Sequence, residues 1–158
     1  GEEALARLGT FTRREFIADA LAAIGGYLKP AVMATAMATQ LPRFEKYESE
    51  LLAHALAGLA EHLSDAALEH AIDTACAMSR KDPRATALAA LAARIRRLPL
   101  EALYPLWRQH MVPVLAQRSR DNFVSDLAAL APALGRLGGT GALIQLCQGI
   151  DDVTQWWP

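Results

Sequence analysis

The sequence predicts an all-α fold, an α-solenoid of about four antiparallel helix pairs with a period of about 35 residues. Leucines recur at intervals of 35, 35 and 36 residues, each followed by alanine, at Leu21, Leu56, Leu91 and Leu127. A second leucine follows each of these anchors after seven residues, at Leu28, Leu63, Leu98 and Leu134. Hydrophobic residues make up 53% of the chain and aromatic residues 6%. Runs of β-branched residues, which favour strands, are missing from the sequence.

The repeat divides the chain into units without an interdomain linker. The turns between the expected helices are short, and none is rich enough in Gly, Ser or Pro to be an interdomain linker. We therefore expect a single helical-repeat domain over 1–158, with units at about 11–42, 43–81, 82–118 and 119–158. Gly1 without a preceding Met indicates a processed tag or an excised piece, so we expect one domain of a longer protein.

The first two units have clear helix-start signals. Thr12 and Glu15 form the pattern of a capping box, and a second helix is expected over about 30–40. In the second unit an apolar stripe runs through the first helix to Leu63. Ser64 is then expected to cap a helix that begins at Asp65, whose charge suits the N-terminal end of a helix.

The last two units are interrupted by proline and glycine. Asp82 is expected to cap the first helix of the third unit, with Pro83 in its first turn. The second helix, from about residue 99, contains Pro105 and Pro113, which predicts a kink or two short helices. In the fourth unit Ser119 is expected to cap a helix bent at Pro132, which ends at 138–139 with a glycine in the left-handed conformation. A last helix is expected over about 141–155, capped by Thr140.

Net charge, the length of the apolar runs and the cysteines indicate which partners and which cellular compartment to expect. The net charge of −1 gives no general attraction to nucleic acid or to anionic membranes. No run approaches the ~18 apolar residues of a membrane span, and no signal peptide is visible. Cys76 and Cys147 lie in apolar helical runs and are expected to be buried free thiols. We therefore expect a cytoplasmic protein with neither nucleic-acid nor membrane partners.

No catalytic or metal-binding pattern stands out in the sequence. His54 and His62 are eight residues apart and could share a helix side, but no third and fourth zinc ligand accompany them. The glycines at 138–141 match neither a P-loop nor a dinucleotide-binding motif and follow no strand, so they predict a turn. Asp151 and Asp152 point to different sides of a helix. We expect no enzyme activity, no cofactor and no metal.

Two features allow both a structural and a functional interpretation. Arg94, within a basic cluster, occupies a repeat position that is apolar in the other units, at Ile24, Leu59 and Leu130. It is either a snorkelling edge residue or a contact to a ligand or partner. Trp156 and Trp157 at the end of the chain either close the last unit's core or anchor another domain.

The stretch from Ser119 to Pro132 and the ending with Gly138-Gly139 and Ile150-Asp-Asp-Val-Thr-Gln-Trp-Trp-Pro resemble a known family. They are similar to the C-terminal HEAT-like helical repeats of large bacterial STAND-type signalling NTPases, relatives of NLR immune receptors. The resemblance implies a sensor or autoinhibitory role. The repeats would bind a trigger, or would contact the upstream domains of the same polypeptide, and the NTPase itself would lie outside these residues.

The expected function is therefore recognition of a protein or other macromolecular trigger. By analogy with HEAT arrays, the second helices would line the concave face. The polar candidates for partner contact there are Thr35, Thr39, Glu69, Asp73, Arg108, Gln109, Gln145 and Gln148. Two alternatives stay open, a free-standing scaffold or adaptor and, less favoured, an enzyme. Self-association through the open edges of the repeat array is a further expectation.

Overall fold

The computed structural model describes residues 19–21, 23–29, 32, 35, 49–154 and 156. Within these ranges the chain consists of helices and turns without a strand, which confirms the predicted all-α class. Most of the first unit lies outside the described residues. The same holds for the expected capping box of Thr12 and Glu15 and for most of the expected helix over 30–40.

The second unit is a helix pair that follows the predicted signals. Helix α4 spans Ser49–Leu59 and continues as a 3-10 turn, η3, over Ala60–His62. Helix α5 spans Asp65–Cys76, and the hydroxyl of Ser64 accepts a hydrogen bond from the backbone N–H of Ala67 at 3.4 Å. The predicted cap at Ser64 is therefore confirmed.

The third unit begins earlier than predicted. Helix α6 spans Lys81–Ile95 with Arg80 as the N-cap, so Asp82 lies in the first turn and the prediction that it caps the helix is wrong. An acidic side chain there still interacts favourably with the helix N-terminus. The break expected between Pro105 and Pro113 is present, because α7 (Leu100–Leu106) and α8 (Val112–Leu115) are joined by a π-helical segment, η4, over Trp107–Met111. Proline lacks the N–H that a regular α-helix needs, which accounts for the change of register.

Helix α9 spans Arg120–Val153 but is two helical segments joined at Gly139. Gly139 has φ 67° and ψ −173°, so the predicted boundary is confirmed, but the residue is not in the left-handed helical region. Ser119 is the N-cap residue of α9, as predicted, but its hydroxyl makes no capping hydrogen bond and accepts one from Asn122 Nδ2 at 2.9 Å instead.

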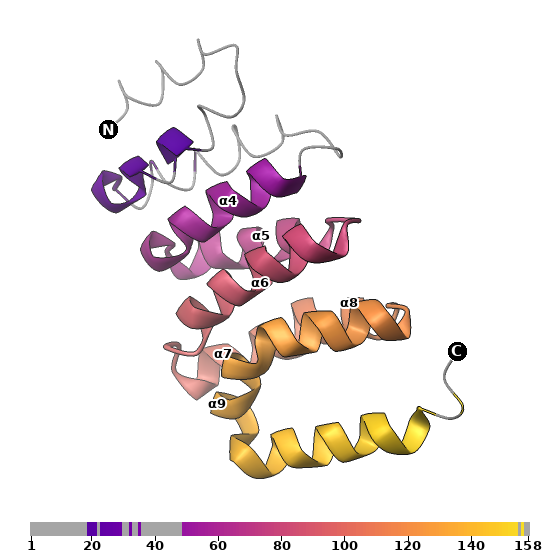
Figure 1. The fold of residues 1–158 in the computed structure, drawn as a ribbon. Helices are drawn as coiled ribbons and strands as arrows, with labels where there is room; N and C mark the ends of the chain where they lie inside the picture. Colours follow the sequence, from indigo (N-terminus) through magenta and orange to yellow (C-terminus); the bar gives the residue numbers. More distant parts are fainter. Residues whose placement is uncertain are drawn as a thin grey trace.

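The helices form two layers (Figure 1). Helices α4, α6 and the first segment of α9 stack side by side in one layer, with α6 packed against both neighbours. Helix α5 and the α7–η4–α8 rod lie behind them and touch through α5 and η4. The core lies between these layers. All four repeat anchors are buried, Leu21, Leu56 and Leu91 fully and Leu127 with 6% exposure.

The repeat is visible in the turns that end the first helices. The backbone N–H of Leu28 donates to the carbonyl of Gly25, that of Leu63 to Ala60 and that of Leu98 to Ile95, at 3.2, 3.4 and 3.0 Å. These three leucines are the residues seven positions after the anchors. The fourth, Leu134, lies inside α9 instead, so the first helix of the last unit continues past this position to the bend at Gly139.

Within the described part of the chain, α9 is the one helix long and apolar enough to cross a membrane by length and composition. This is weak evidence for a span, because core helices of other proteins pass the same test and α9 is bent at Gly139. The expectation that the protein has no membrane partner stays a prediction.

Candidate functional site

Four of the predicted contact residues lie on two neighbouring segments of the second layer. Glu69 and Asp73 are exposed on α5, and Arg108 and Gln109 are exposed on η4, which packs against α5. Asp73 Oδ1 lies 2.8 Å from His110 Nδ1, which links the two segments. These four residues define what we call the α5–η4 face, which offers charges of both signs beside amide groups.

The other predicted contact residues do not join this face. Gln145 and Gln148 are exposed on the second segment of α9, beyond the bend at Gly139, and α9 as a whole packs mainly against α6. Thr35 is exposed, but its neighbours lie outside the described residues. Thr39 and Trp157 also lie outside them, so the structure does not test either residue.

Arg94 holds two successive units together. Its guanidinium donates from Nε to the carbonyl of Leu63 at 3.3 Å and from Nη2 to Asp65 Oδ1 at 2.8 Å. The side chain is 19% exposed, with its stem at the apolar repeat position. This geometry matches the snorkelling alternative, since the stem packs in the seam while the charged end reaches an acid at the surface.

Several cations of the basic cluster around α6 pair with acids on neighbouring helices. Lys81 Nζ lies 2.8 Å from Asp121 Oδ2 on α9, and this contact raises the pKa of Lys81. Arg80 pairs with Glu50 on α4, and Arg97 pairs with Glu61 on η3. These ion pairs reduce the local positive charge that a polyanion would bind. The expectation that nucleic acid is not a partner stays a prediction.

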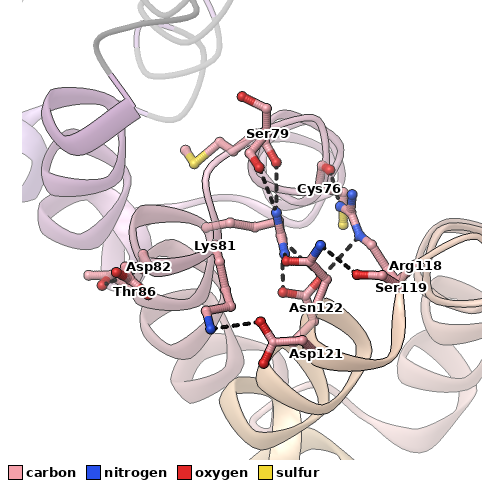
Figure 2. Close-up of polar contacts among 12 residues, drawn as sticks. Cys76, Ser79, Lys81, Asp82, Thr86, Arg118, Ser119, Asp121 and Asn122 are labelled. Carbon is pink, nitrogen blue, oxygen red and sulfur yellow. Dashed lines mark hydrogen bonds and ion pairs between the residues drawn. The ribbon is translucent and has the colours of Figure 1, made fainter. Parts of the chain in front are cut away.

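A buried polar network lies where α5, α6 and α9 meet, and sequence reasoning missed it (Figure 2). Arg84 of α6 is fully buried, and its Nε donates to both carboxylate oxygens of Asp126 at 2.8 and 2.9 Å. Its Nη1 donates to the carbonyl of Met78 at 3.0 Å, and its Nη2 to Asn122 Oδ1 at 2.8 Å. A single guanidinium therefore joins the end of one unit to the start of another.

Arg118 extends this network to the end of α5. Its Nε donates to Asp126 Oδ2 at 3.2 Å, and its Nη2 donates to the carbonyl of Cys76. Among the described residues, every buried side-chain nitrogen or oxygen has a hydrogen-bond partner. The buried atoms of this network are thus bonded within the protein, as expected of a network that holds helices together.

One departure from the repeat phrase could have revealed the network. Asp126 stands where the other units have Ala20, Ala55 and Ala90, immediately before the buried leucine anchor. A carboxylate at a buried alanine position requires a partner, because an unpaired buried charge is very costly.

The two cysteines differ in environment. Cys76 is half-buried, and burial raises the pKa of its thiol to about 11, which makes it a poor nucleophile near neutral pH. Cys147 is exposed, so the prediction that both thiols are buried is wrong for Cys147. Its helix, the second segment of α9, has only one layer of neighbours (Figure 1).

Groups of three or more His, Cys, Asp or Glu placed to hold a metal are absent from the described residues.

The last helical segment exposes apolar side chains. Ile144, Val153 and Trp156 are 54%, 43% and 79% exposed. The core-closing alternative for the C-terminal tryptophans is therefore wrong for Trp156, because its side chain is largely exposed to solvent. Comparison of the chain with protein-family models, curated protein sequences and solved structures found no match.

Proposed function

We propose that this chain is a HEAT-like α-solenoid of about four repeats that serves as a non-catalytic recognition domain, a sensor or an autoinhibitory module, of a bacterial signalling or defence NTPase. The observation that carries the repeat architecture is the recurrence of one turn geometry at Leu28, Leu63 and Leu98, each seven residues after a buried leucine. Stacked units of this kind typically present an extended surface of second helices to a partner.

The α5–η4 face is the surface that best fits this role. Its side chains are exposed, come from two successive units and include Glu69, Asp73, Arg108 and Gln109. The buried Arg84 network joins the first segment of α9 to α6, the helix against which α5 packs. A partner with mixed charge and hydrogen-bonding groups would suit it, either an upstream domain of the same polypeptide or a macromolecular trigger.

The first test of this proposal concerns the gene. A reading frame that encodes a Walker motif upstream of Gly1 supports the NTPase assignment, whereas a start codon directly before Glu2 would contradict it and favour an adaptor. In the full-length protein, ATP hydrolysis would then be compared between the R108A/Q109A variant and a Q117A/R136A control, which substitutes the same two residue types outside the α5–η4 face.

We expect the R108A/Q109A variant to change basal or triggered hydrolysis, because it removes contacts from the α5–η4 face while folding is preserved. The Q117A/R136A control removes an exposed glutamine and an exposed arginine that are not predicted contact residues, and it should leave hydrolysis unchanged. Equal behaviour of the two variants would contradict the assignment of the face.

The second candidate function is a scaffold or adaptor that works by self-association. The observation that favours it is the exposed apolar set of Ile144, Val153 and Trp156 at one end of the array. Light scattering at several concentrations tests this function. A concentration-dependent dimer supports the adaptor, and a monomer at all concentrations favours the recognition domain.

A further inference from the structure

We infer that residues 140–153, the second segment of α9, form a hinged arm. In this proposal the arm exchanges between its present place against the first segment of α9 and a second place beside α7–η4–α8 in the second layer. The inference rests on packing and backbone geometry alone, so it does not depend on the proposed function.

The hinge is Gly139. It is the one described residue with a positive φ, and its ψ of −173° leaves the helical region entirely. The chain reverses direction there (Figure 1), at the same end of the molecule as α7. Glycine crosses between backbone regions without the steric barrier of a Cβ, so a rotation of the arm requires change at very few bonds.

The arm is weakly attached in its present place. No residue from 138 to 154 is buried, whereas α5 fully buries Leu68 and Ile72. Half-buried Leu143, Leu146 and Ile150 make its apolar contacts. Its tip is held by a hydrogen bond at the surface, from Arg120 Nη2 to Thr154 Oγ1 at 2.7 Å. Segments with few buried contacts open at low free-energy cost.

The second layer has a free apolar surface that the arm can cover. Leu100 and Tyr104, one turn apart on α7, are 44% and 57% exposed, and Val112 on α8 is 43% exposed. The second helix of the preceding unit makes the equivalent contact with this rod, since α5 packs against η4. Helix α9 contacts the second layer mainly at α7. On the side of α9, η4 and α8 therefore lack a neighbour comparable to α5.

Chain direction sets the register of the second place. The arm starts near α7 and would run parallel to α7–η4–α8. Because both segments start at the same end, each step along the arm matches one step along that rod. Ile144, 54% exposed at present, would then cover Tyr104. Cys147 would lie level with Arg108, and both residues are exposed in the present placement.

The exposed native thiol of Cys147 provides the test. In a C76A background, Arg108→Cys introduces a thiol at the predicted second place, and Thr86→Cys introduces one at an exposed site on α6, in the first layer. Each variant would be oxidised at low protein concentration. The internal disulfide would be measured by peptide mass against time.

We expect the R108C variant to form an internal disulfide with Cys147 several-fold faster than the T86C variant does. Adding Gly138→Ala should raise the rate for R108C further. A Cβ at Gly138 would lie 2.4 Å from Ala142 Cβ, which disfavours the present place.

Three outcomes would overturn the inference. One is no internal disulfide at position 108 although a thiol reagent shows both thiols accessible. Another is equal rates for R108C and T86C, which indicates an unfolded arm without a defined second place. The third is a disulfide formed only between molecules, which indicates that a second copy covers the surface.

A G135C/L143C variant in a background without the native cysteines controls for oxidation, since Leu143 Cδ1 lies 3.6 Å from a Cβ at Gly135.

Discussion

The buried guanidinium of Arg84 and the buried carboxylate of Asp126 join α6 to α9 through two hydrogen bonds from one nitrogen, at 2.8 and 2.9 Å. Both side chains are almost fully removed from solvent, with 1% and 2% exposure. The pair also organises its surroundings, because Arg84 binds the carbonyl of Met78 and Asp126 accepts from Arg118. The polar network thus fixes the angle at which one unit meets the next.

Arg84→Met is expected to destabilise the fold strongly, by about 3–5 kcal/mol, because it leaves the Asp126 carboxylate buried with only Arg118 as a charged partner. Urea unfolding followed by circular dichroism measures this loss. The matched control is Lys81→Met, which breaks an exposed pair between the same two helices and should leave the unfolding midpoint nearly unchanged.

The double variant R84M/D126L tests the pairing itself. We expect it to lose less stability than the sum of the two single variants, since neither charge is then left alone. Additive losses, or an Arg84→Met variant as stable as Lys81→Met, would contradict the structural role of the network.

Leu91→Asp is expected to abolish the cooperative folded state. Leu91 is fully buried in α6, the helix that packs against both α4 and α9, and an aspartate there would be a buried charge without a partner. The control, Ala89→Asp, lies two residues away on the exposed side of the same helix. Helical circular dichroism and a thermal melt distinguish the two, and equal melts would show that the leucine anchors do not form the core.

The sequence predicted the elements that depend on local signals. The leucine anchors, the cap at Ser64, the irregular stretch between Pro105 and Pro113 and the bend at Gly138-Gly139 each depend on residues within one or two helical turns. Such features can be inferred from propensity, capping and periodicity alone.

Features that depend on partners distant in sequence were not predicted. Arg84 and Asp126 are 42 residues apart, and Asp73 and His110 are 37 apart, so no local pattern joins them. Likewise, the exposure of Cys147 and Trp156 follows from where the second segment of α9 lies after Gly139. A helical apolar run predicts one face to be covered, but it does not say by which neighbour.

Arg94→Leu separates the two interpretations of that residue. The equivalent positions Leu59 and Leu130 are buried, so a leucine fits the seam, and we expect stability within about 1 kcal/mol of the parent chain. Arg94→Ala should cost more, about 1–2 kcal/mol, because the packed stem is lost as well as the bonds to Leu63 and Asp65. If Arg94 is instead a partner contact, the R94L variant will fold normally and lose binding.

The stability of the fold is expected to decrease between pH 9 and 10.5. Burial raises the pKa of Cys76 from 9.0 to about 11, so in this range the thiol ionises in the unfolded chain and stays protonated in the folded one. The folded state then binds more protons than the unfolded state, and stability falls as pH rises, by at most about 3 kcal/mol once both values are passed.

The measurement is the urea midpoint at pH 8, 9, 10 and 10.5 under reducing conditions, compared between the parent chain and Cys76→Ala. The substitution should flatten the pH dependence, because it removes the titrating group. Cys147→Ala is the matched control and should retain the full dependence, since that thiol is exposed. An equal slope in the parent chain and Cys76→Ala would show that the buried thiol does not couple to folding.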